Sequence, residues 1–118
     1  MGQPVSFFEI MSEHPEQVTD FYTRLFDWNV SVDPDMDGYG LVDTGAGETA
    51  ITGGIGPASS PEGAGVKIYV RVEDLDAALA RAESLGAKRL LDPMDLPGEF
   101  GRIAVVADPD GNPLGLWV

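Results

Sequence analysis

The chain has 118 residues, no cysteine, and 20 acidic against 7 basic residues, which gives a formal net charge of −13. A chain of this length buries most of its apolar surface without cross-links, and the absence of cysteine excludes disulfides and sulfur-ligated zinc. The acidic charge disfavours nucleic-acid partners, because phosphate binding needs a basic face. That charge is typical of a surface that favours solubility, and it would also attract a cationic ligand.

The sequence carries no sign of a membrane or export segment. No apolar run approaches the roughly 18 residues that a membrane span needs. The first residues, MGQPVSFFEIMSEHPEQ, lack the basic and apolar regions of a signal peptide. We therefore expect a cytoplasmic protein with no membrane partner.

The first half of the sequence predicts a strand, a helix and three further strands. Pro15 and Glu16 are typical of a first helical turn, and apolar residues recur with helical spacing from Val18 onward. A helix is therefore expected over residues 15–26. The strands are expected at 4–11, 28–32, 39–43 and 48–55. A linker rich in Gly, Pro and Ser follows at about 57–64.

The second half repeats the same pattern. A helix is expected over 75–85, with an acidic first turn and Gly86 as its C-terminal stop. Strands are expected at 65–72, 88–91, 100–107 and 113–118. Placing Phe7 over Lys67, an offset of 60 residues, matches strand to strand and helix to helix. The chain is therefore predicted to be an α+β protein, a βαβββ unit written twice within one domain over 1–118, with module 1 at about 4–56 and module 2 at about 65–118.

Three segments carry a family resemblance: FEI…HPEQVTDFYTRLFDW, VEDLDAALARAESLGA and GEFGRIAVVADPDGNPLGLW. In these segments the chain resembles the vicinal oxygen chelate superfamily, which includes glyoxalase I, bleomycin-resistance proteins and extradiol dioxygenases. The resemblance covers essentially all 118 residues. It implies two βαβββ modules whose curved sheets surround a cavity.

The resemblance also implies where a metal would be held. Metal-using members carry one ligand, usually His, Glu or Gln, on the first strand and one on the last strand of each module. Here the corresponding positions are Phe7, Gly54, Lys67 and Gly115. Phe and Gly offer no donor atom and a lysine ammonium repels a cation, so we expect no bound metal and no other cofactor. Gly115 stands where metal-using members have an acid, and the vacated position is expected to leave the cavity open.

Alternate positions of the same strands supply candidate ligand contacts. Lys67 is interpreted as a structural cation paired with Glu9 or another carboxylate, as a contact for an anionic ligand group, or as a solvated side chain. The aromatic residues either pack in the core or line an apolar pocket. The candidate ligand-binding residues are Phe7, Glu9, Lys67, Tyr69, Gly115 and Trp117. No catalytic residue is assigned.

Three classes of function stay open at this stage. The favoured one is metal-free binding or sequestration of a small molecule, as in the bleomycin-resistance branch. A glyoxalase-like enzyme of lyase or dioxygenase type would need a non-standard site, with chemistry from Glu9, Lys67 and Tyr69. A structural or interaction module is the third. The expected partners are a cationic or aromatic small organic molecule and a second copy of the chain, because open curved sheets leave edges that need cover.

Overall fold

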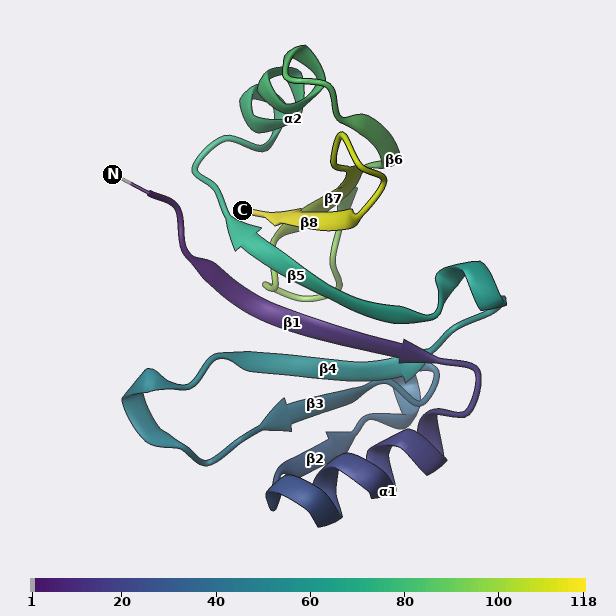
Figure 1. Ribbon diagram of the computed structural model, residues 1–118. Helices are drawn as coiled ribbons and strands as arrows, with labels where there is room; N and C mark the ends of the chain where they lie inside the picture. The colour runs from purple at the N-terminus through teal and green to yellow at the C-terminus, as the bar shows by residue number, and fades with distance from the viewer. Residues whose placement is uncertain (1) are drawn as a thin grey trace. The chain divides into compact units, whose positions relative to one another are not determined.

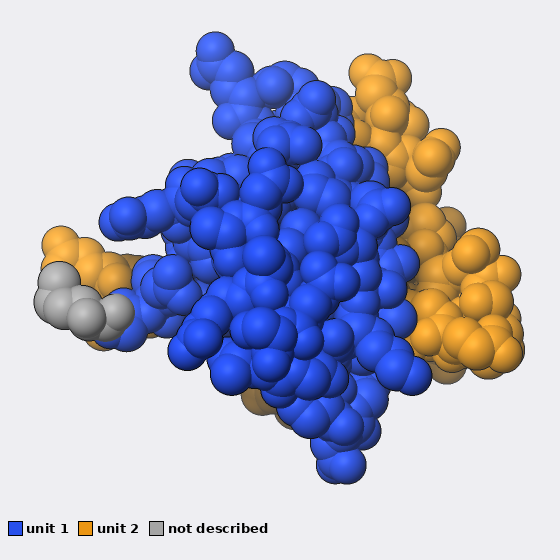
Figure 2. Space-filling model, turned by 90° about the horizontal axis from the view of Figure 1, so that it is seen from above, with its two compact units in different colours: residues 1–6, 67–118 blue, residues 7–66 orange. Residues whose placement is uncertain are grey.

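A computed structural model describes residues 2–118 (Figure 1). The order of helices and strands is βαβββ, twice over, with three short 3-10 helices in the connections. The chain divides into two compact units, one of residues 7–66 and one of residues 67–118 together with the N-terminal residues up to Ser6 (Figure 2). The predicted α+β fold class is confirmed.

The first module pairs its strands in the order β2, β3, β4, β1. Its elements are β1 (Val5–Ser12), α1 (Pro15–Phe26), β2 (Asn29–Val32), β3 (Gly40–Asp43) and β4 (Thr52–Pro57). β1 runs parallel to β4, and the other pairs are antiparallel. The core consists of Ile10, Val42 and Ile55, and Val18 and Tyr22 of α1 pack against it. α1 therefore covers one face of this part of the sheet with the apolar stripe that the sequence predicted.

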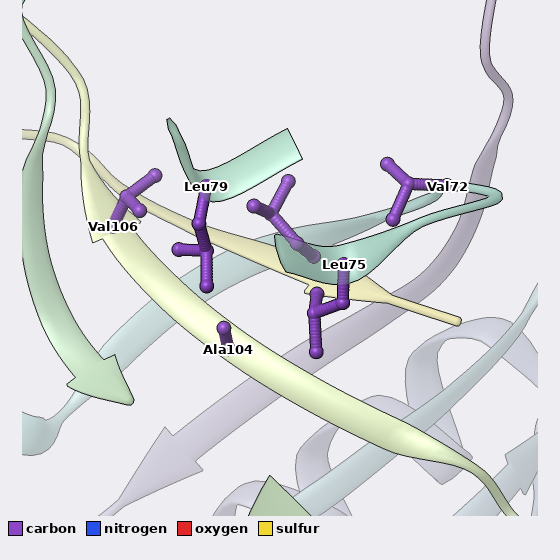
Figure 3. Packing of buried hydrophobic residues seen from close by; sticks show 6 residues of the cluster. Val72, Leu75, Leu79, Ala104 and Val106 are labelled. Carbon is purple, nitrogen blue, oxygen red and sulfur yellow. The ribbon is translucent and has the colours of Figure 1, made fainter. Parts of the chain in front are cut away.

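The second module repeats this arrangement with the order β5, β8, β7, β6. Its elements are β5 (Gly65–Arg71), α2 (Leu75–Ser84), β6 (Lys88–Asp95), β7 (Arg102–Ala107) and β8 (Pro113–Trp117). The carboxylate of Asp74 caps α2 by accepting a hydrogen bond of 3.0 Å from the amide of Ala77. Figure 3 shows Leu75 and Leu79 of α2 packed over Ala104 and Val106 of β7, in a cluster completed by Val72 and Leu116.

The two modules keep a nearly constant spacing. β1 begins at Val5 and β5 at Gly65, and α1 begins at Pro15 and α2 at Leu75, so both pairs start 60 residues apart, and the remaining strands start 59 to 62 residues apart. The predicted internal repeat is therefore confirmed in element type, order and offset.

Two of the predicted strand boundaries differ from the observed ones by four residues, and the others differ by no more than two. The strand expected at 48–55 begins only at Thr52, because Gly47–Thr49 form a 3-10 turn that the amide of Ala50 closes on the carbonyl of Gly47. The linker expected at 57–64 contains a second 3-10 turn, Pro61–Gly63. The strand expected at 88–91 continues to Asp95 with two register shifts against β7, and the second shift, between Leu91 and Met94, spans Pro93.

No helix within residues 2–118 is long and apolar enough to cross a membrane.

Candidate functional site

Each module has one sheet face covered by its helix and a second face turned away from it, which we call the helix-free face. Side chains alternate along a strand, so Phe8 and Ile10, which belong to the core under α1, place Phe7 and Glu9 on the helix-free face of module 1. In module 2, Leu116 belongs to the core under α2. The predicted site residues of both modules therefore lie on helix-free faces.

In module 2, the position of the superfamily's acid is covered by an aromatic ring. Gly115 is in register with Tyr69 on the neighbouring strand. A Cβ built at Gly115 would lie 2.6 Å from Cγ of Tyr69 and would overlap Cδ2 and Cε2 of the ring. Tyr69 is itself buried, with 6% of its surface exposed. The expectation that Gly115 leaves an opening is therefore wrong, because the Tyr69 ring occupies that space.

In module 1, too, a tyrosine ring lies over the glycine at the corresponding position of the last strand. Gly54 is in register with Glu9, and a Cβ at Gly54 would overlap the ring and hydroxyl of Tyr39. The same ring crosses Gly56, where a Cβ would lie 2.5 Å from Cδ2 of Tyr39. In both modules, glycine on the last strand makes room for a tyrosine ring.

Tyr39 also makes a polar contact with a predicted site residue. Its hydroxyl donates a hydrogen bond of 2.7 Å to Oε2 of Glu9, in a half-buried setting. Sequence reasoning placed Tyr39 at the start of the strand expected at 39–43 but did not name it as a site residue, and β3 begins only at Gly40. The one available signal was the pair of glycines at 54 and 56, two residues apart on the same face, which indicates that something bulky crosses that strand.

Four of the six predicted residues lie together on module 2. Nζ of Lys67 is 5.8 Å from the centre of the Tyr69 ring. Trp117, two positions beyond Gly115, donates from Nε1 to the carbonyl of Phe100 at 2.6 Å. The remaining two, Phe7 and Glu9, share β1 of module 1.

The sequence analysis missed Arg71, which is in register with Trp117. The guanidinium carbon of Arg71 lies 4.4 Å from the centre of the Trp117 ring. Strand alternation was the available signal, since residues 67, 69 and 71 share one face of β5.

The motif DPDGN forms the turn that leads into β8. One carboxylate oxygen of Asp108 accepts hydrogen bonds from the amides of Asp110 and Asn112, and the other accepts from the side-chain amide of Asn112. These contacts, the side-chain one foremost, hold the pKa of Asp108 below its ordinary 3.8. The turn they stabilise leads into Pro113 and sets the register that brings Gly115 against Tyr69.

The residues at the superfamily's metal positions do not fit a metal ion. Phe7, Gly54 and Gly115 have no donor atom, Lys67 is a cation, and tyrosine rings cover both glycines. Within residues 2–118, no group of three or more His, Cys, Asp or Glu side chains is arranged to hold a metal.

A groove of about 370 Å³ lies elsewhere in module 1. Its lining includes Met11, Val18, Phe21, Tyr22 and Ala64, and none of the six predicted site residues contributes to it. It lies beside α1, on the helix-covered side, and is therefore separate from the candidate site.

The chain is similar to known proteins in sequence and in fold. The sequence pattern of the glyoxalase-like domain matches residues 8–117. The anthracycline biosynthesis protein DnrV of Streptomyces peucetius is 31% identical in an alignment that covers 98% of this chain and 46% of DnrV. The chain therefore spans about half the length of this curated relative.

Two solved structures share the fold. A glyoxalase/bleomycin resistance protein/dioxygenase superfamily member from Vibrio splendidus has a TM-score of 0.66 at 16% identity, and the match covers 98% of this chain and 97% of that one. Methylmalonyl-CoA epimerase from Mycobacterium tuberculosis has a TM-score of 0.65 at 17% identity and covers 96% and 85%. The resemblance drawn from the sequence motifs is confirmed.

Proposed function

Because the chain belongs to the glyoxalase-like domain family, we propose that it is a small-molecule binding protein whose helix-free faces hold an organic ligand without a metal or other cofactor. The observation that carries the proposal is the composition of the superfamily's metal positions. They contain an aromatic ring, an ammonium group and two glycines that lie beneath tyrosine rings. Such a set favours contact with an apolar or aromatic body over coordination of an ion.

The aromatic side chains suggest the ligand's chemistry. Phe7 and Trp117 are half-buried on helix-free faces, and Phe100, beside Trp117, is 53% exposed. The relative DnrV is named for anthracycline biosynthesis, and anthracyclines contain fused aromatic rings. We therefore propose a ligand with a fused aromatic part, contacted by the residues predicted from the sequence. The contacts proposed on module 1 are Phe7, Glu9 and Tyr39. Those proposed on module 2 are Lys67, Tyr69, Arg71, Gly115 and Trp117, together with Phe100.

A homodimer is part of this proposal. β2 and β6 each pair on one side only, and unpaired strand edges favour cover by another chain. Sedimentation at micromolar concentration should give about twice the chain mass of 12.5 kDa. A single species at the chain mass would contradict it.

We also propose a cytoplasmic location, since a chain without cysteine needs no oxidising compartment.

The binding proposal is tested with a neutral probe, 2-naphthalenemethanol, titrated into ¹⁵N-labelled protein. The chain has two tryptophans, so its spectrum contains two indole N–H signals, which a Trp117→Phe variant assigns. Saturable shifts of the Trp117 signal, with the Trp28 signal unmoved, are expected. Phe100→Ala should weaken binding about fivefold, since an aromatic contact of this kind contributes about 1 kcal/mol.

Phe21→Ala is the matched control, because Phe21 is exposed to a similar degree, 56%, but lines the groove beside α1. It should leave the affinity unchanged. If Phe21→Ala weakens binding and Phe100→Ala does not, the ligand occupies that groove and the proposal is wrong. Stoichiometric zinc, nickel or manganese retained through gel filtration without chelators would overturn the metal-free part of the proposal.

The hydrogen bond between Tyr39 and Glu9 favours one alternative, an enzyme that moves a proton without a metal. A carboxylate held by a phenol at 2.7 Å is a plausible general base. The test is turnover of the hemithioacetal of methylglyoxal and glutathione by metal-free protein, with Glu9→Gln and Tyr39→Phe as variants. Turnover that Glu9→Gln abolishes would establish the enzyme, and no turnover above that of buffer would leave binding as the function.

A further inference from the structure

Arg71 is held against an aromatic plane that is itself fixed at its edge. Its guanidinium carbon lies 4.4 Å from the centre of the Trp117 ring, and the two residues are in register on β5 and β8. Nε1 of Trp117 donates to the carbonyl of Phe100 at 2.6 Å, which fixes the ring on the β6–β7 connection. The indole therefore forms a platform for the guanidinium.

The connection is shaped to allow this arrangement. Gly101 adopts a φ of +94°, which L side chains rarely adopt. A Cβ there would overlap the carbonyl oxygen of Val118 and lie 3.2 Å from Nε1 of Trp117. Only glycine leaves the loop close enough for the Phe100 carbonyl to reach the indole. The position of the platform is thus set by backbone geometry as well as by the side chains.

Stacking leaves the hydrogen-bonding capacity of Arg71 available. A guanidinium stacked on a ring uses its flat face, whereas its N–H donors point outward in its own plane. Three other arginines, Arg24, Arg89 and Arg102, form ion pairs with carboxylates. Within residues 2–118, Arg71 forms no ion pair, although the chain has 20 acidic residues. Its side chain is exposed, so a ligand can reach the donors.

We propose that Arg71 is the anion-contact residue of module 2, and that the ligand is an organic carboxylate attached to an aromatic body. The planar fork of the guanidinium matches the two oxygens of a carboxylate. Phe100, exposed in the adjoining loop, supplies an apolar surface for the ring. Lys67, which shares this face of β5 with Arg71, adds a second positive charge. The inference rests on the proposed binding function and adds that the ligand is negatively charged.

The experiment compares two probes of the same shape. Naphthalene-2-carboxylate and neutral 2-naphthalenemethanol are titrated into the full chain, and the Trp117 indole signal is followed. The carboxylate should bind about tenfold more tightly, which corresponds to about 1.4 kcal/mol, because the guanidinium donates charge-assisted hydrogen bonds to it. Arg71→Gln should remove that advantage, so that the carboxylate binds no more tightly than the neutral probe. Arg71→Lys keeps the positive charge but loses the planar pair of N–H donors, so it should retain only part of the preference for the carboxylate probe.

Arg81→Gln is the matched control, because Arg81 is an exposed arginine of α2 in the same unit. It removes the same charge and should leave the preference for the carboxylate intact. Circular dichroism of each variant checks that the fold is retained, and Arg71→Lys serves if Arg71→Gln fails to fold.

The two proposals fail in distinguishable ways. If the neutral probe binds and the carboxylate binds no better, or if Arg71→Gln and Arg81→Gln reduce its affinity equally, the assignment of Arg71 is wrong and the binding function stands. If neither probe shifts the Trp117 signal, both proposals are overturned.

Discussion

The aromatic ring of Tyr69 lies over the backbone of Gly115, its partner in register on the neighbouring strand. A substitution at Gly115 therefore meets the ring near its base, where Cγ would lie 2.6 Å from the new Cβ. Gly115→Ala should lower the free energy of unfolding by about 1–3 kcal/mol, as overpacking of a well-filled site does. Urea unfolding measures it.

Gly2→Ala is the control for Gly115→Ala, since nothing lies within 4 Å of a Cβ at Gly2. In a Tyr69→Ala background the same substitution at Gly115 should cost much less, because the ring is gone. An equal cost in both backgrounds would mean that the ring is not the cause.

The hydrogen bond from Tyr39 to Glu9 should be measurable as a coupling. Tyr39→Phe removes only the hydroxyl that donates at 2.7 Å to Glu9. We expect a loss of about 1–2 kcal/mol in the free energy of unfolding, as for a hydrogen bond to a charged partner. A double-mutant cycle with Glu9→Gln separates this contact from the others that each residue makes.

Tyr22→Phe is the matched control for Tyr39→Phe. Tyr22 stacks on Trp28 at 5.5 Å between ring centres, and within residues 2–118 its hydroxyl forms no hydrogen bond. Removing the Tyr22 hydroxyl should therefore change the free energy of unfolding little. A coupling energy near zero between Tyr39 and Glu9 would contradict the assignment of their bond.

Leu79 should be among the most sensitive positions of module 2. It is 1% exposed and packs over Ala104 and Val106, as Figure 3 shows. Leu79→Ala should lower the free energy of unfolding by about 2–5 kcal/mol through lost burial and the cavity left behind. Leu90→Ala removes the same atoms from a side chain that is 58% exposed, and should cost less than about 1 kcal/mol. Equal costs would place Leu79 outside the core.

The lowered pKa of Asp108 predicts that the stability of the fold depends on pH. Its pKa is lowered from 3.8 chiefly by the side-chain amide of Asn112. Because the folded pKa lies below the unfolded one, the carboxylate stabilises the fold above pH 3.8 and loses that contribution as the pH falls through the lower folded value. Asn112→Ala should raise the pKa of Asp108 toward 3.8, measured by NMR titration of its carboxyl carbon.

Asn29→Ala, an exposed asparagine of module 1, is the control for Asn112→Ala. It should leave the titration of Asp108 unchanged. The thermal midpoint of Asn112→Ala should fall below that of the wild type at pH 7, and the difference should shrink at pH 3. A difference that persists undiminished at pH 3 would assign the effect to something other than the Asp108 charge.

Local features of the sequence determined the architecture. The helical spacing from Val18, the first turn at Pro15 and the 60-residue offset predicted both helices and the repeat, because each depends on residues close together along the chain. The donor chemistry of Phe7, Lys67 and the two glycines was equally readable from residue types. The extent of β6 was not, because its register shifts depend on pairing with β7.

Only the tertiary structure decided what stands at the vacated positions. Gly115 was expected to leave an opening and Gly54 to offer no donor atom, yet the rings of Tyr69 and Tyr39 cover these two glycines from other segments of the chain. Arg71 became a candidate contact only when the register of β5 with β8 placed it on Trp117. The physical reason is that a missing side chain is a local property of the chain, whereas the ring that fills its space comes from a distant segment through strand pairing and side-chain packing.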